Sequence, residues 1–314
     1  MRRPREIAVL ALVLAAALSL AVVVLGRGAA AAPLPGGWEA VGSNVKAPAQ
    51  PALNGIVLAL NTDRPGVMYV GGNFTDAGGN PNADYIAEWD GKTWKALGAP
   101  KLNGQVTSIA YRNGTVYAGG TFTAAGGDSS AGFLAAWDGT KWGPVCKPSG
   151  PKGNVYALEI SGSTLYVGGA FQNGAGIASA DYMLACDLNT GAARALVAGY
   201  TSSSVVGLGV DSRGTLYAAG GFGDLEGIPA ADNIAAYSGG TWHALGTGPG
   251  GAAMTDRARS MTVSGTSVYV GSDGTDIAGI PQADNIAKWN GSAWSALGAN
   301  AGGGNGIFPP RSSV

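Results

Sequence analysis

The chain has 314 residues with a formal net charge of -1, and only 12% of its residues are charged. Glycine accounts for 54 residues without a G-x-y period, which excludes collagen, and 46% hydrophobic residues exclude a disordered chain. The near-neutral balance offers no basic surface for nucleic acid. Many short apolar runs separated by Gly, Asn and Asp favour an all-β protein.

The N-terminus has the pattern of an export signal. Arg2, Arg3 and Arg5 precede the apolar run 7–25, and small residues follow up to Ala32. We expect a signal peptide over residues 1–31 and a secreted or cell-surface protein. The apolar run nearly spans a bilayer, so an uncleaved membrane anchor through residues 7–25 is the alternative.

A short phrase recurs about every fifty residues. Its tyrosines are spaced 48, 49, 51 and 52 residues apart. The copies are Tyr69-Val-Gly-Gly-Asn-Phe74, Tyr117-Ala-Gly-Gly-Thr-Phe122, Tyr166-Val-Gly-Gly-Ala-Phe171, Tyr217-Ala-Ala-Gly-Gly-Phe222 and a shortened Tyr269-Val-Gly-Ser272. Such a period indicates stacked supersecondary units that depend on their neighbours.

Each unit contains four short apolar segments. In the first unit we expect strands at 56–60, 67–70, 85–89 and 93–97, with Asp90-Gly91 forming a hairpin turn. Four antiparallel strands in fifty residues are typical of a β-propeller blade. A β-solenoid would have shorter periods, and a β-sandwich would not repeat its sequence.

Two residue types explain the architecture. The paired glycines permit a close backbone approach or a bulge where blades pack face to face. The recurring tryptophans suit the seams between blades, because each buries a large aromatic surface.

The Tyr-Val-Gly-Gly-x-Phe phrase and Trp89-Asp-Gly-x-x-Trp94-x-Ala-Leu-Gly98 resemble the kelch and galactose-oxidase-type β-propeller repeats of exported bacterial proteins. The resemblance covers about residues 36–310 and implies a propeller domain over 36–314. Kelch blades usually have a tyrosine at a fixed distance after the double glycine; here that position holds Tyr85, Phe133, Tyr182, Asn233 and Asn285.

Five complete units and two fragments can be recognised. Residues 38–42 match the last strand of a unit, and residues 305–307 match the start of a first strand. We therefore expect five complete blades and a partial sixth, in a chain truncated at its C-terminus. The alternative is a five-bladed ring with one extra strand.

The sequence shows no catalytic set. There is a single histidine, His243, which excludes a copper site with two histidine ligands. His243 lies in a repeated strand phrase where we expect an exposed side chain, and nothing around it in the sequence indicates the base of a Ser-His-Asp triad. Cys146 and Cys186 could form a disulfide after export, but Cys186 occupies a tryptophan position of the repeat, so two separate thiols are slightly favoured.

An aspartate recurs just before the third strand, at Asp84, Asp181, Asp232 and Asp284. A ring of these carboxylates would suit Ca²⁺. The favoured interpretation is local, with each carboxylate binding nearby backbone N–H groups. No cofactor is therefore predicted, with calcium as the alternative.

The longer connections, which we expect at one end of every blade, are the predicted ligand surface. Its candidate residues are Asp76, Asp128, Asp224, Glu226, Arg257 and Arg259. The leading functional hypothesis is an exported, non-enzymatic module that binds protein or glycan. The alternatives are a hydrolase or lyase, with its active residues in the loops or in a missing part, and a structural envelope element.

Overall fold

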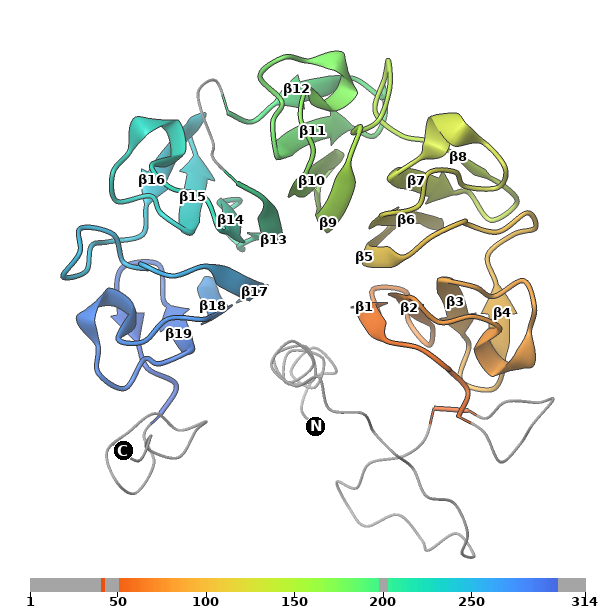
Figure 1. Cartoon of the computed structure of the whole chain (residues 1–314), viewed down its shortest axis with the longest axis horizontal. Helices are drawn as coiled ribbons and strands as arrows, with labels where there is room; N and C mark the ends of the chain where they lie inside the picture. The colour runs from red at the N-terminus through yellow and green to blue at the C-terminus, as the bar shows by residue number, and fades with distance from the viewer. Residues whose placement is uncertain (1–40, 43–50, 198–202, 299–314) are drawn as a thin grey trace, which may run out of the picture. The chain divides into compact units, whose positions relative to one another are not determined.

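The computed structural model describes residues 41–42, 51–197 and 203–298, which form two compact units, 41–145 and 146–298. Each unit is built from four-stranded antiparallel sheets whose strands follow one another in sequence order. The predicted all-β fold is confirmed: the chain is a β-propeller, and each sheet is one blade (Figure 1).

The unit 41–145 contains two blades. The first comprises β1 (Val57–Asn61), β2 (Met68–Gly72), β3 (Ile86–Trp89) and β4 (Trp94–Ala96). The second comprises β5 (Val106–Arg112), β6 (Thr115–Gly120), β7 (Leu134–Trp137) and β8 (Trp142–Pro144). The first strands β1 and β5 contact each other, so the two sheets pack face to face.

The unit 146–298 contains three blades. The third blade has β9 (Asn154–Ser161), β10 (Thr164–Ala170), β11 (Met183–Asp187) and β12 (Ala193–Ala195). The fourth has β13 (Val205–Val210), β14 (Leu216–Gly220), β15 (Ile234–Ser238) and β16 (Thr241–Ala244). The fifth has β17 (Ala258–Ser264), β18 (Ser267–Ser272), β19 (Ile286–Trp289) and β20 (Trp294–Ser295). Strand β13 contacts both β9 and β17.

The predicted strand positions are close to the observed ones, but two ends differ. Gly71 and Gly72 lie inside β2 rather than closing it. Tyr85 is outside β3, because its φ of 63° is incompatible with a strand. The equivalent residues Phe133, Tyr182, Asn233 and Asn285 all have φ between 60° and 64°, so this position redirects the chain into the third strand of every blade.

Both predicted roles of the paired glycines are confirmed. Opposite Gly71 and Gly72 the first strand has a β-bulge between Val57 and Ala59. A Cβ on Gly72 would lie 2.0 Å from the carbonyl oxygen of Ile56. A Cβ on Gly71 would lie 2.6 Å from Val106 of the next blade, so this glycine allows the two blades to approach.

The tryptophans of the last strands link neighbouring blades, as predicted. The indole N–H of Trp142 donates to the Leu97 carbonyl oxygen at 2.6 Å, and that of Trp294 donates to Leu245 at 2.5 Å. The phenylalanine that ends each repeat phrase fills the interior of its own blade, because Phe74, Phe122, Phe171 and Phe222 are at most 2% exposed. The repeat phrase is therefore a packing motif.

The hairpin turns have the expected chemistry. In the turn between β7 and β8, Asp138 accepts hydrogen bonds from the backbone N–H groups of Thr140 and Lys141 and from the Thr140 hydroxyl. These donors lower the pKa of Asp138 to about 2, and the Thr140 hydroxyl makes the largest contribution. Gly139 follows with a φ of 97°.

The prediction of two separate thiols is wrong. Cys146 and Cys186 form a disulfide, with their Cα atoms 5.5 Å apart. The backbone N–H of Lys147 also donates to the Gly191 carbonyl oxygen, which holds the segment after Cys146 beside the outer strands of the third blade. Cys186 does occupy a tryptophan position, but the chain entering this blade brings Cys146 next to it.

Several predictions lie outside the described residues. These are the signal or anchor over 1–31, most of the front fragment 38–42, and the back fragment 305–307. Among the residues that the structure describes, no helix is both long and apolar enough to cross a membrane.

Candidate functional site: a pocket between two blades

The connection from the second to the third strand is a compact loop in every described blade. It contains a short 3-10 turn: Ala77–Gly79, Ser129–Ala131, Gly174–Gly176, Leu225–Gly227 and Ile277–Gly279. Because strands alternate in direction, these loops and the connections between blades lie at the same end of their sheets. The predicted candidate residues belong to this end.

The recurring aspartates shape these loops. In four blades the carboxylate accepts the backbone N–H of the residue before the 3-10 turn, at 2.6–3.0 Å. The acceptors are Asp84, Asp181, Asp232 and Asp284, and the donors are Asp76, Asn173, Asp224 and Asp276. These bonds support the local interpretation of the repeated aspartate. Within the described residues no group of three or more His, Cys, Asp or Glu side chains could hold a metal ion.

One loop position distinguishes the fourth blade. Its occupants are Gly78, Ala175, Glu226 and Ala278, inside the 3-10 turn, and Gly126, which lies three residues before the turn of the second blade; all have φ between 55° and 61°. Small residues suit this position, because a Cβ on Gly78 would lie 2.7 Å from the Trp94 ring. A glutamate in the left-handed region is uncommon and costs backbone strain. The repeat architecture therefore does not explain Glu226.

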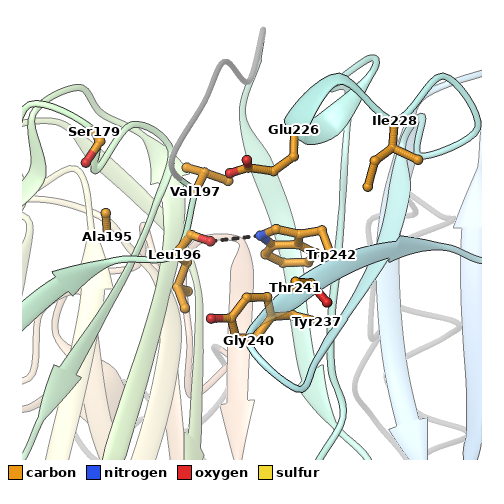
Figure 2. Close-up of a pocket in the computed structure, with 10 residues that line it drawn as sticks. All are labelled: Ser179, Ala195, Leu196, Val197, Glu226, Ile228, Tyr237, Gly240, Thr241 and Trp242. Carbon is orange, nitrogen blue, oxygen red and sulfur yellow. Dashed lines mark hydrogen bonds between the residues drawn. The ribbon is translucent and has the colours of Figure 1, made fainter.

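Glu226 lines a cavity of about 490 Å³ between the third and fourth blades. Figure 2 shows the cavity, with the Glu226 carboxylate directed toward the side formed by Val197. The third blade contributes Ser179, Ala195, Leu196 and Val197; the fourth contributes Glu226, Ile228, Tyr237, Gly240, Thr241 and Trp242. Both blades belong to the unit 146–298.

A hydrogen bond and an aromatic pair support the cavity wall. The indole N–H of Trp242 donates to the Leu196 carbonyl oxygen at 2.8 Å, which joins the last strands of the two blades. Tyr237 and Trp242 pack together with their ring centroids 5.1 Å apart. Trp242 and Leu196 are buried, whereas Tyr237 and Ile228 are half-buried. The cavity thus has aromatic and aliphatic residues in its lining.

The polar groups of the cavity are few and differ in kind. Ser179 and Thr241 provide hydroxyl groups, Tyr237 provides a phenol, and Glu226 is the one carboxylate among the described lining residues. Binding sites for small ligands combine such an apolar lining with a small number of positioned polar groups. A carboxylate and hydroxyls beside aromatic rings can bind a polyhydroxylated molecule through both hydrogen bonds and ring stacking.

The six predicted surface residues belong to both units. Asp76 and Asp128 lie in the unit 41–145, where each is part of its own turn. Asp128 accepts hydrogen bonds from the hydroxyl and the backbone N–H of Ser130. Both bonds lower the pKa of the Asp128 carboxyl, and the bond from the hydroxyl has the larger effect. Asp224 precedes the turn that carries Glu226. Only Glu226 reaches the cavity.

The two arginines lie at the start of β17. Arg259 forms an ion pair with Asp273, with its Nε at 2.7 Å and its Nη2 at 2.6 Å from Oδ2. Hydrogen bonding to Arg259 lowers the pKa of the Asp273 carboxyl. Arg257 donates to the Ser204 hydroxyl at 3.0 Å. Both arginines are exposed and structurally paired, so they form a surface separate from the cavity.

Sequence reasoning missed most of the cavity. Tyr237, Thr241 and Trp242 belong to the repeated strand phrases, and their position beside a neighbouring blade depends on packing. One signal was available: the fourth repeat replaces Gly or Ala by Glu226. His243 projects from β16 and is exposed, as predicted, with its Nε2 3.1 Å from the Thr241 hydroxyl.

No family model matches the chain, and no curated protein matches it in sequence. Solved structures with a similar fold include the extracellular domain of BT4673 from B. thetaiotaomicron, at 11% identity and a TM-score of 0.51, covering 79% of this chain and 30% of that one. A nidogen/laminin complex matches at 13% identity and a TM-score of 0.48, covering 73% of this chain and 77% of that one. YCF48 bound to D1 peptide matches at 13% identity and a TM-score of 0.43, covering 82% of this chain and 72% of that one. Likeness at this identity shows the fold alone.

Proposed function

We propose that the chain is an exported, non-enzymatic propeller that binds an extracellular partner, a protein or a glycan, and that the cavity at Glu226 favours a glycan. The observation that carries the proposal is the occupant of one repeated turn position. Four blades place Gly or Ala there, and the fourth places a glutamate that lines a cavity between two blades. A residue that the scaffold does not require is a candidate for selection by function.

The chemistry of the lining supports a glycan. Sugar rings present apolar C–H faces and rows of hydroxyl groups. The Tyr237 ring offers a surface for stacking, and the Glu226 carboxylate accepts hydrogen bonds from hydroxyl groups. Ser179 and Thr241 add neutral donors and acceptors on either side. A strongly anionic glycan would be disfavoured, because it would place its charge near Glu226.

The support for export and for a family resemblance comes from the sequence. The basic and apolar segment over residues 1–31 supports export, with residues 7–25 as the membrane contact if the segment is retained. The glycine and tryptophan phrases support kinship with kelch and galactose-oxidase-type propellers. The propeller domain is assigned to residues 36–314.

The enzymatic alternative is a hydrolase or lyase acting on the same class of ligand. Glycoside hydrolysis uses two carboxylates across the scissile bond. Among the described lining residues Glu226 is the one carboxylate, so the cavity favours binding over hydrolysis.

The test is a screen of the purified chain on an array of neutral and acidic extracellular glycans, with Glu226→Ala and Thr241→Ala run in parallel. We expect binding to a neutral glycan that both substitutions weaken. The matched control is Asp138→Ala, which removes an exposed turn carboxylate of the unit 41–145 that does not belong to the cavity lining. Glycan binding that survives Glu226→Ala unchanged would remove the cavity from the proposal. Release of reducing ends from a bound glycan would favour the enzymatic alternative.

A further inference from the structure

The outer strands of the third blade are joined differently from those of the other described blades. In the other four, an aromatic ring of the third strand packs on a tryptophan of the fourth strand, with ring centroids 5.1–5.6 Å apart. The pairs are Trp89–Trp94, Trp137–Trp142, Tyr237–Trp242 and Trp289–Trp294. At the same register the third blade has Cys186 opposite Ala193. No ring contact therefore supports β12 at this position of the described blade.

The disulfide stands in for another contact of the repeat. Gly98 follows the fourth-strand tryptophan of the first blade by four residues, and a Cβ on it would lie 2.6 Å from Cζ3 of Trp137 in the next blade. Cys146 follows Trp142 by the same four residues and also has a positive φ, 48° against 88° for Gly98. Cys186 holds the position of the ring. In the unit 146–298 a covalent bond thus replaces a contact between glycine and tryptophan.

The segment after Cys146 also holds the beginning of β12. The backbone N–H of Lys147 donates to the Gly191 carbonyl oxygen at 2.7 Å, and Lys147 pairs with Ala192 in a parallel bridge. A Cβ on Gly191 would lie 3.3 Å from the Lys147 side chain, so the two segments are in close contact. Gly191 and Ala192 lead directly into β12. The disulfide and the bridge together fix this strand from its first residue.

Strand β12 continues directly into the wall of the cavity. Its last residue, Ala195, and the two residues that follow, Leu196 and Val197, all line the cavity. The Leu196 carbonyl oxygen accepts the indole N–H of Trp242 at 2.8 Å (Figure 2). Leu196 and Val197 are buried, so a displacement of β12 would move packed groups of the wall. The position of the wall therefore depends on what holds β12.

We propose that oxidation of Cys146 and Cys186 is the maturation step that sets the cavity wall, so that the chain presents a formed ligand cavity only in its oxidised state. The inference names the regulation of the cavity at Glu226, and its consequence for ligand binding rests on the proposed function. In the reduced chain β12 keeps its short ladder with β11 and the Lys147 bridge, but not the bond that replaces the ring contact. Local opening of the strand becomes more frequent as a result.

The oxidation balances as a thiol–disulfide exchange with a small disulfide such as oxidised glutathione. One cysteine thiolate attacks a sulfur of the oxidant, which forms a mixed disulfide and releases one thiol. The second cysteine thiolate displaces the other thiol, so the protein loses two electrons and two protons and the oxidant becomes two thiols. Both cysteines are buried in the folded blade. The exchange therefore takes place before the blade closes, and the finished bond is shielded from reductants.

The test follows the cavity wall by NMR in the full chain. Solvent exchange of the Trp242 indole proton is measured in the oxidised chain, folded with oxidised glutathione, and in the reduced chain, folded in a phosphine reductant. The Trp294 indole, which donates to the Leu245 carbonyl oxygen in the same unit, is the internal reference. On reduction the ratio of the Trp242 rate to the Trp294 rate should rise by about tenfold or more. A ratio that stays constant or falls would overturn the proposal.

The matched control is the double variant Cys146→Ala/Cys186→Ala. Its Trp242 indole proton should exchange as fast as in the reduced wild type, and the reductant should not change that rate. Slow exchange in the variant would show that the wall is set without the bond. A response of the variant to the reductant would show that the reductant acts elsewhere, and it would likewise contradict the proposal.

The glycan array distinguishes this inference from the proposed function. Applied to the oxidised and the reduced chain, the array should show glycan binding that reduction weakens. If the oxidised chain binds no glycan, the proposed function fails, while the indole exchange still decides whether the disulfide sets the wall. Equal glycan binding by the two forms would contradict the regulatory role of the bond.

Discussion

At the scale of single residues, the repeat separates what the fold needs from what it does not. A backbone conformation shared by all equivalent positions, such as the positive φ of the residue before each third strand, belongs to the fold. Glu226 departs from its equivalents Ala175 and Ala278 at a position that favours small residues. Such departures are where a repeated scaffold carries a separate property.

Glu226→Ala should leave the free energy of unfolding unchanged within about 0.5 kcal/mol, since alanine already occupies this turn in two other blades. The reverse exchange at the equivalent site, Ala278→Glu, serves as the matched comparison. Chemical denaturation of both variants checks this expectation. A loss of several kcal/mol in Glu226→Ala would assign the glutamate a structural role instead.

Asp211 provides a residue-scale prediction of pH dependence. Its side chain is fully buried and accepts hydrogen bonds from Arg213 and from the backbone N–H groups of Arg213 and Thr215. Burial alone would raise the pKa of Asp211, but the Arg213 side chain and the backbone donors outweigh it and hold the pKa below 3.8. A depressed carboxyl pKa means that the folded state favours the ionised form.

The stability from Asp211 is therefore fully present above the ordinary carboxyl pKa and is lost as pH falls through the lower folded pKa. Asp211→Asn should destabilise the chain by about 2 kcal/mol at neutral pH. The difference from the wild type should shrink as pH falls below 3.8. Urea denaturation across this range measures it, and a difference that stays constant with pH would contradict the assignment.

At the scale of elements, the strands were predictable because their apolar runs, turn residues and repeat period agree. The sequence could not predict the ends of the second strands, since Gly71 and Gly72 continue the ladder against a bulged partner. It also could not predict the disulfide, because the approach of Cys146 to Cys186 depends on the path between two blades. The cavity was missed for the same reason: its walls come from different blades, and only Glu226 was visible as an irregular residue.

The bulge opposite the paired glycines leads to an element-scale prediction. Gly72→Ala should destabilise the first blade by about 3 kcal/mol, because the new Cβ would lie 2.0 Å from the Ile56 carbonyl oxygen. Gly114→Ala, in an open turn at a φ of 88° with no atom within 4 Å of a Cβ, should cost only the left-handed backbone strain, about 1 kcal/mol. Thermal unfolding of the pair distinguishes steric from conformational cost. Equal losses would contradict the close approach.

At the scale of the whole molecule, the described chain consists of two units that carry the same blade but differ in covalent support. The Cys146–Cys186 bond closes a loop of 40 residues within the unit 146–298. Closing a loop of this size stabilises a fold by about 4 kcal/mol in the chain-entropy model.

Replacing both cysteines by alanine should lower the stability of the unit 146–298 by about this amount and leave the unit 41–145 unchanged. Hydrogen exchange resolved by peptide, with and without the substitutions, reports on each unit separately. Faster exchange spread equally over both units would show that they unfold as one cooperative body.

The whole-molecule claim is that a repeated, self-packing scaffold carries a ligand cavity between the third and fourth blades. Its most direct test is a calorimetric titration of the neutral glycan that binds best on the array, with the wild type, Glu226→Gln and Glu226→Ala at matched thermal stability. Loss of a charged hydrogen-bond acceptor should weaken binding by about tenfold or more in both variants. Equal affinity in all three proteins, or no glycan bound by the wild type, would contradict the account.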